Sequence, residues 1–237
     1  MEYKRTEGST TVEIRGMKTK GLVLEPEVSR DVEPGIVTLY DMSRFHNDGA
    51  MTNVTWVQLP SGLWVMSFNG VTSLVNCGTG NSLNLTGDMS FLFWLYLPTV
   101  ADGKMVICRG LANADGYYMQ IANAGANINR IFLTLNQVAA QTQQLSVDNT
   151  LTAATWMHIG ITRSGINCLI YRDGMDSTGA PVAMASPVTS ARNFYIGQYN
   201  TGALRVAGSL SLFNVYNYAL TPGQILKRYE ATRRFFS

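Results

Sequence analysis

Apolar and polar residues alternate along most of the chain after residue 35, and turn-forming residues separate the alternating stretches. This period of two is typical of β-strands with one buried face. Residues 89–97 are instead apolar at successive positions, which predicts a central strand buried on both faces. We expect strands at 36–40, 54–59, 63–68, 71–76, 89–97, 104–109, 116–121, 131–135, 156–163, 167–172, 194–197 and 209–216. Their spacing predicts an all-β, two-sheet antiparallel sandwich.

Two local signals refine this pattern. Asn69-Gly70 is the dipeptide most typical of a two-residue β-hairpin, so we expect the strands on either side of it to pair. Near the C-terminus, Thr221-Pro222-Gly223-Gln224 combines an N-cap threonine, a proline at the first helical position and a glutamine at the third. This capping box predicts one short helix over Ile225 to Thr232.

Several motifs follow one another in an order that resembles a known family. They are Asp41 to Gly49, Ser67 to Gly70, Trp156 to Thr162, Cys168 to Gly174 and Gly208 to Thr221. Together they resemble, over residues 36 to 230, the laminin G-like and concanavalin A-like jelly rolls of the lectin and glucanase superfamily. The resemblance implies a jelly-roll sandwich with a short C-terminal helix. It does not select a function, because this fold hosts lectins, adhesion modules, enzymes and structural subunits.

Charge divides the chain into two parts. The chain carries 18 Lys+Arg and 16 Asp+Glu, or 14% charged residues, where soluble domains have about 25%. Residues 1–35 hold six basic and seven acidic residues, whereas residues 36–222 contain no glutamate. We therefore expect an extended N-terminal arm at 1–35 and a jelly-roll domain at 36–237. A formal net charge of +2 argues against nucleic acid as a partner, because that partner requires a concentrated basic face.

Cysteine usage and apolar runs bear on the compartment. Cys77, Cys108 and Cys168 are far apart and form no C-x-x-C pair, so we expect buried free thiols. No run reaches the roughly 20 apolar residues of a membrane-spanning helix. The first 35 residues lack the apolar core of a secretory signal, so the chain as given is expected to be soluble.

The sequence predicts no enzyme. Glycosidases of the resembled fold use paired glutamates, and residues 36–222 have none. Asp173 and Asp176 are the closest acid pair outside the opening loop, but Asp173-Gly174 is typical of a hairpin turn. The two histidines, His46 and His158, belong to no recognisable catalytic framework. His158 alternates with apolar neighbours on a predicted strand, which favours a structural role.

A calcium site is one interpretation of the opening loop. The resemblance implies it, because many relatives hold calcium with loop oxygens, and calcium takes about six to eight of them. The candidates are Asp41, Asn47, Asp48 and Asn69. The alternative is that these side chains form turns with their own backbone. Otherwise no cofactor is expected.

Glycan binding requires exposed rings beside amide or carboxylate groups. Trp56, Tyr117 and Tyr118 are the candidates for stacking on a sugar, whereas Trp94 and Trp156 lie in apolar strands and are expected in the core. The alternative is that the candidate rings are partly buried at sheet edges or contact another subunit.

The charged arm favours an assembly role. Val12, Ile14, Leu22 and Leu24 alternate with other residues and are expected to add a strand to the sheet of a neighbouring subunit. We therefore expect a structural or decoration subunit of a larger assembly, most compatible with a capsid or tail protein on a virion surface. Its partners would be other protein subunits and a surface glycan. Two alternatives stay open: an extracellular or cell-surface carbohydrate-binding or adhesion module, and a degenerate enzyme.

Overall fold

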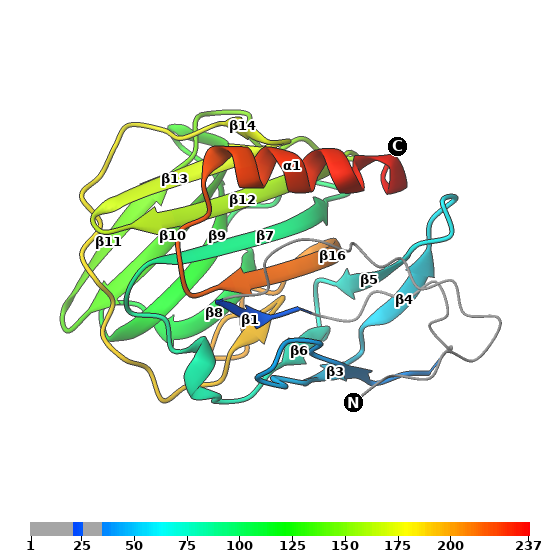
Figure 1. Ribbon diagram of the computed structural model, residues 1–237, viewed down its shortest axis with the longest axis horizontal. Helices are drawn as coiled ribbons and strands as arrows, with labels where there is room; N and C mark the ends of the chain where they lie inside the picture. The colour runs from blue at the N-terminus through cyan, green and yellow to red at the C-terminus, as the bar shows by residue number, and fades with distance from the viewer. Residues whose placement is uncertain (1–20, 26–34) are drawn as a thin grey trace.

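Two antiparallel β-sheets face each other in the computed structural model, which describes residues 21–25 and 35–237 (Figure 1). The first sheet has the order β14-β13-β12-β7-β16-β5-β4, with β1 attached to β16. Its strands are β1 (Leu22–Leu24), β4 (Thr55–Gln58), β5 (Trp64–Asn69), β7 (Met89–Tyr96), β12 (Trp156–Ser164), β13 (Asn167–Arg172), β14 (Met175–Asp176) and β16 (Ala207–Tyr216). The predicted all-β sandwich of jelly-roll type is confirmed.

The second sheet has the order β11-β10-β9-β8-β15-β6-β3-β2. Its strands are β2 (Thr38–Leu39), β3 (Gly49–Thr52), β6 (Leu74–Asn76), β8 (Met105–Leu111), β9 (Asp115–Ala124), β10 (Asn127–Gln137), β11 (Ala140–Leu145) and β15 (Tyr195–Ile196). Strands β3 and β11 were not predicted. Strand β11 reads Ala-Gln-Thr-Gln-Gln-Leu, which lacks the apolar alternation that reveals a strand.

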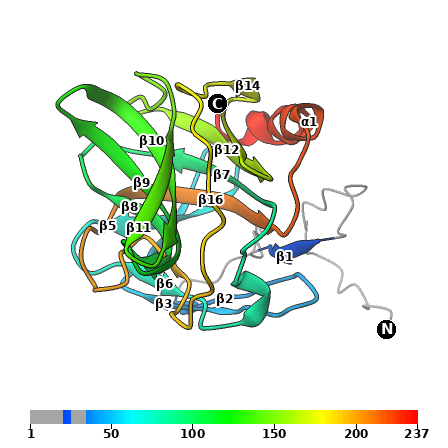
Figure 2. The ribbon, with the colours of Figure 1, turned by 90° about the vertical axis from the view of Figure 1, so that its left-hand side faces the viewer.

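Helix α1 (Pro222–Thr232) covers the side of the first sheet that faces away from the second (Figure 2). Its capping box is confirmed, because Thr221 Oγ1 accepts from the Gln224 backbone N–H and the Thr221 N–H donates to Gln224 Oε1. The short 3₁₀-helices η1 (Asn81–Leu83) and η2 (Arg233–Phe235) complete the described elements. No described helix is long and apolar enough to cross a membrane.

The position of β7 explains its uninterrupted apolar sequence. Phe91 and Phe93 point into the main core between the sheets, whereas Leu92 and Trp94 belong to clusters on the other face. That face is covered by α1 and the C-terminal residues, and Phe236 stacks on Trp94 with ring centroids 4.2 Å apart. Both faces of β7 are therefore buried, as the pattern predicts.

The hairpin predicted at Asn69-Gly70 is wrong. Strand β5 pairs with β4 and β16 in the first sheet, whereas β6 pairs with β3 and β15 in the second. Asn69 Oδ1 instead accepts hydrogen bonds from the backbone of Val71, Thr72 and Ser73. The side chain thus stabilises a wider turn that carries the chain between the sheets.

The described part of the predicted arm lies in the chain's own sandwich. Strand β1 pairs antiparallel with β16, and Leu22 and Leu24 are 4% and 1% exposed. These two leucines are therefore not available as contacts to another subunit, because β16 offers their backbone a partner and the core covers their side chains. Val12 and Ile14 lie outside the described residues, as does most of the segment before Gly35.

Candidate functional site

Asp41 is the centre of a hydrogen-bond network in the opening loop. Its side chain is 2% exposed. One carboxylate oxygen accepts from the backbone N–H groups of Glu25 and Ser43, both at 2.9 Å. The other accepts from the Asn47 N–H at 2.7 Å and the Ser43 hydroxyl at 2.8 Å. The carboxylate thus ties the segment after β1 to the loop that follows β2.

The other calcium candidates are also engaged in turns. Asp48 Oδ1 accepts from the Asp41 backbone N–H at 2.8 Å. The Asn47 amide donates to Val23 O at 2.6 Å and to Ser82 Oγ at 2.9 Å. Asn69 belongs to the separate turn after β5. Within residues 21–25 and 35–237, no cluster of three or more His, Cys, Asp or Glu side chains fits a metal ion. The donor geometry therefore favours the turn interpretation over calcium binding.

The three predicted glycan contacts lie in different environments. Tyr117 points into the core, is 1% exposed and donates from its hydroxyl to Leu83 O at 2.6 Å. Trp56, on β4, is half-buried against the main core. Tyr118 lies on the outer face of the second sheet but is only 4% exposed. The rings of Tyr117 and Tyr118 are therefore not accessible for stacking on a sugar, and Trp56 is only partly accessible.

Tyr118 nevertheless lies in a polar surface that sequence reasoning missed. Adjacent strands place Cys108, Tyr118, Thr134 and Gln143 in one row across β8, β9, β10 and β11. Their neighbours Tyr117, Met119, Leu133 and Leu135 belong to the main core, so the row lies on the other side of the second sheet. Cys108, Tyr118 and Thr134 are buried on that side, and Gln143 is half-buried. We define the amide face as Tyr118, Gln120, Thr134, Gln141, Gln143 and Tyr199.

Hydrogen bonds and ring contacts order the amide face. The Tyr118 hydroxyl donates to Gln141 Oε1 at 3.1 Å, and the Gln143 amide donates to Thr134 Oγ1 at 3.2 Å. Tyr199 packs edge-on against Tyr118 with ring centroids 5.8 Å apart. The Tyr199 hydroxyl accepts from the Ala112 N–H at 2.8 Å, so its own proton remains available for a second hydrogen bond.

The amide face is uncharged at neutral pH. Burial raises the pKa of the Tyr118 hydroxyl above its ordinary value, so the phenol stays protonated. Gln141 is exposed, and Gln120, Gln143 and Tyr199 are half-buried. Amide and hydroxyl groups both donate and accept hydrogen bonds, as sugar hydroxyls do. The surface therefore offers the chemistry for a neutral, hydroxyl-rich ligand.

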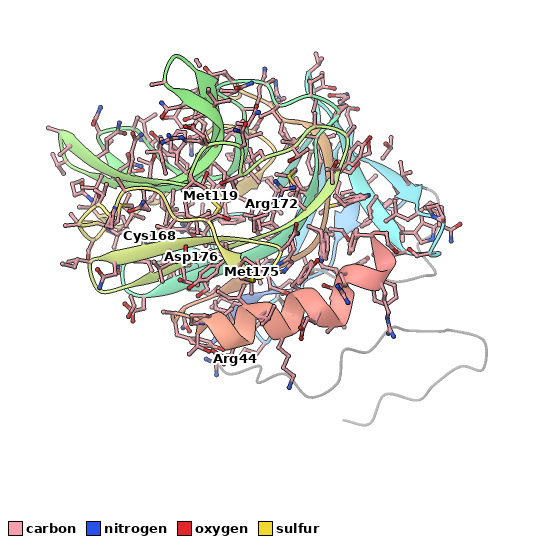
Figure 3. All side chains as sticks on the ribbon, turned by 90° about the horizontal axis from the view of Figure 1, so that it is seen from above. Arg44, Met119, Cys168, Arg172, Met175 and Asp176 are labelled. Carbon is pink, nitrogen blue, oxygen red and sulfur yellow. The ribbon has the colours of Figure 1, made fainter. Side chains whose placement is uncertain are left out.

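The acidic candidates serve turns. Asp173 adopts φ 53°, and its carboxylate accepts from the His158 N–H at 2.9 Å. Asp176 Oδ1 accepts from the Thr178 N–H at 2.8 Å. The β14 residues Met175 and Asp176 lie beside α1, close to the Arg172 end of β13 (Figure 3). These contacts give each carboxylate a structural function.

The histidines and cysteines also occupy structural or isolated positions. His158 is 3% exposed and contacts the rings of both Trp94 and Tyr229. Burial, with a smaller contribution from Arg228, lowers its pKa to about 3, so the imidazole is neutral at physiological pH. His46 is exposed. The thiols of Cys77, Cys108 and Cys168 are free and buried, as predicted.

Comparison with known proteins identifies the fold at the level of a superfamily. Residues 69–226 match the family described as "Concanavalin A-like lectin/glucanases superfamily". No curated protein matches the sequence.

Three solved structures with a similar fold are described as binding domains. The binding domain of Paraclostridial Mosquitocidal Protein 1 superimposes with a TM-score of 0.70 and 14% identity, over 90% of this chain and 52% of that chain. The receptor binding domain of botulinum neurotoxin type G gives a TM-score of 0.64 and 18% identity, over 89% of this chain and 51% of that chain. The binding domain of botulinum neurotoxin DC in complex with SialylT gives a TM-score of 0.65 and 16% identity, over 90% of this chain and 52% of that chain. This chain spans about half the length of each.

Proposed function

Because the chain belongs to the concanavalin A-like lectin/glucanases superfamily, we propose that it is a non-enzymatic carbohydrate-binding domain. The observation that carries the proposal is the amide face, where Gln120, Gln141, Gln143 and Tyr199 are accessible around the buried Tyr118 and Thr134. The ligand that fits this chemistry is a neutral glycan, held by hydrogen bonds to the glutamines and by the edge of Tyr199.

The energetics of the amide face favour a polar, uncharged ligand. Gln120 donates to Gly103 O at 2.9 Å and Gln143 to Thr134, so both side chains are held in place. Preorganised side chains lose little rotamer entropy on binding, which lowers the cost of recognition. Sugar hydroxyls can replace the water molecules on this surface and form the same number of hydrogen bonds with the side chains. A charged ligand would find no oppositely charged side chain in this row.

The compared structures support a role at a cell surface. Their names describe binding domains, one of them a receptor binding domain and one in a complex with SialylT. If this chain also binds a glycan, it would act in an extracellular or surface-exposed setting. The ligand of that complex is not carried over, because the amide face is uncharged and a neutral ligand fits its chemistry.

A glycan array followed by calorimetry tests the proposal. The wild-type chain is expected to bind neutral oligosaccharides, and the double variant Gln120→Ala/Gln143→Ala to lose at least about tenfold in affinity, because two hydrogen-bonding side chains are lost. Gln58→Ala is the matched control, since Gln58 is an exposed glutamine on β4 of the other sheet. Equal affinity of the double variant and the wild type would overturn the assignment of this face.

The absence of enzymatic activity is part of the proposal. Its support is that residues 36–222 contain no glutamate and that Asp173 and Asp176 are engaged in turns. Retaining and inverting glycosidases both need two carboxyl groups across the scissile bond. Release of reducing sugar from a glycan that binds would contradict this part.

A structural subunit of a larger assembly, such as a virion, is the second candidate. The observation that favours it is the β10–β11 turn, where Val138 is 78% exposed and is followed by an edge strand without charged residues. Uncharged edge strands are ready to pair with another chain. Light scattering of the purified chain over a range of concentrations tests this role, and a monomer at every concentration would count against it.

A further inference from the structure

Asn69-Gly70 lies in a turn that the proposed glycan site does not use. The dipeptide occurs once in the sequence, and Asn69, the last residue of β5, is exposed. The side-chain amide of an asparagine can react with the backbone nitrogen of the next residue. Glycine favours this reaction because it has no Cβ to shield its nitrogen. The geometry of the turn then sets how fast the reaction is in the folded chain.

Three backbone N–H groups surround the side-chain oxygen of Asn69. Its Oδ1 accepts from Val71 at 2.9 Å, from Thr72 at 2.8 Å and from Ser73 at 3.1 Å. Its Nδ2 donates to Thr72 Oγ1 at 2.9 Å, which fixes the orientation of the amide. Donors placed around a carbonyl oxygen stabilise the negative charge that develops there during nucleophilic attack. The Asn69 amide carbon is therefore an activated electrophile.

The same contacts hold this carbon close to the Gly70 nitrogen. The bond from the Val71 N–H closes an Asx-turn, a ring that contains both Asn69 Cγ and the Gly70 nitrogen. Among the described residues, none accepts a hydrogen bond from the Gly70 N–H. The two reacting atoms thus belong to one ordered turn, which lowers the entropic cost of bringing them together.

The fold itself requires glycine at position 70. Gly70 adopts φ 74°, a conformation that disfavours residues with a side chain. A Cβ at this position would also lie 2.8 Å from the Cβ of Ala207, at the start of β16. The unshielded nitrogen after Asn69 is therefore a consequence of how β5 passes β16.

We propose that Asn69 is a site of spontaneous deamidation and that the folded turn accelerates the reaction. The Gly70 nitrogen attacks Asn69 Cγ and forms a C–N bond. The Cγ–Nδ2 bond breaks, and Nδ2 leaves as ammonia with the proton from the Gly70 nitrogen. Water then hydrolyses the succinimide, which gives aspartate when the Cγ–N bond is cleaved and isoaspartate when the bond to the main-chain carbonyl is cleaved. The inference is independent of glycan binding.

The turn is suited to the aspartate product. A carboxylate at position 69 keeps an oxygen that accepts from the three N–H groups. Arg205 Nη1 donates to Val71 O at 2.9 Å, so a guanidinium group lies at the same turn. Both features stabilise a negative charge. Isoaspartate instead lengthens the main chain by one methylene group at the end of β5.

Peptide mapping by mass spectrometry tests the proposal. The wild-type chain is incubated at the same mildly alkaline pH in buffer and in guanidinium chloride, and deamidation is followed at each asparagine. In the folded chain we expect Asn69 to react first. Its rate should be at least about threefold higher than in the denatured chain, because only the folded turn supplies the ordered donors.

Asn81 is the internal control. It is also exposed and precedes a small residue, Ser82, but it lies in η1. The helical backbone turns the following nitrogen away from the Asn81 side chain, so folding should slow the reaction there. A rate at Asn69 that is equal or lower in the folded chain would overturn the proposal, as would earlier deamidation of another asparagine.

Asn69→Asp tests whether the turn accepts the product. The variant also serves as the chromatographic standard for deamidated wild type. We expect its melting temperature to lie within about 2 °C of the wild-type value. A larger fall would show that the turn does not accommodate the carboxylate and would overturn the assignment of aspartate as the fitting product.

Discussion

Removing the Asp41 carboxylate provides the sharpest test of how the opening loop is built. In Asp41→Ala, the backbone N–H groups of Ser43 and Asn47 lose their acceptor in a buried setting, since both residues are at most 7% exposed. A buried donor left without a partner costs about 1–3 kcal/mol. The Glu25 N–H is closer to solvent and finds water more readily.

The sum predicts a loss of roughly 3–5 kcal/mol in the free energy of unfolding. For a chain of this size this corresponds to a fall of about 6–20 °C in melting temperature. Asp41→Asn keeps one acceptor oxygen and should lose about half as much. Differential scanning calorimetry and denaturant titration measure both variants. Asp102→Ala is the matched control, because Asp102 Oδ1 accepts one exposed backbone bond, from Asn123 at 2.7 Å.

Calcium separates the two interpretations of the same residue. A cation at 100 times its dissociation constant would stabilise the folded chain by about 2.7 kcal/mol. We expect the wild-type melting temperature to be the same in calcium and in chelator, because the Asp41 oxygens already accept protein hydrogen bonds. The reasoning is refuted if calcium stabilises the wild type but not Asp41→Ala. It is also refuted if Asp41→Ala has the same melting temperature as the wild type.

Two further predictions concern the face of the first sheet under α1. In the folded chain the pKa of His158 is about 3, against an ordinary value of 6.5. As the pH decreases, the unfolded chain therefore binds a proton at His158 before the folded chain does. The free energy of unfolding should then fall as the pH decreases from about 6.5 towards 3. The urea midpoints measured at pH 7.5 and at pH 4.5 should differ less in His158→Phe than in the wild type. A pH dependence that is unchanged in the variant would show that His158 is not its cause. Phe236 stacks on Trp94 at 4.2 Å and contacts Trp156 at 4.9 Å, so Phe236→Ala should cost about 2–4 kcal/mol. Ser237→Ala serves as its control in denaturant unfolding, and a loss below about 0.5 kcal/mol would show that the stack is not stabilising.

Local signals sufficed wherever a short stretch of sequence fixed its own structure. The capping box at Thr221 starts a helix because its hydrogen bonds join residues three positions apart. The continuous apolar run of β7 indicated a central strand, because it has no polar face to give to water. The Asn69-Gly70 dipeptide failed because the turn preference was real but the pairing of the flanking strands depends on distant β4, β16 and β15.

The functional surfaces depended on contacts between distant segments. Tyr117 and Tyr118 are adjacent, but pleating sends the first into the core and the second to the amide face. The glutamines of that face come from strands whose register no local pattern specifies.

The sequence by itself determined the fold class, the helix start, the free thiols and the lack of a glutamate pair, because these follow from composition or from residues a few positions apart. Only the tertiary structure decided that Leu22 and Leu24 pair with the chain's own β16, that Asp41 binds backbone N–H groups, and that the buried Arg109 donates to the carbonyl oxygens of Thr79 and Ser190. The physical reason is the same in each case. Hydrogen bonds and counter-charges are satisfied in space, by whichever distant segment the packed sheets bring within reach.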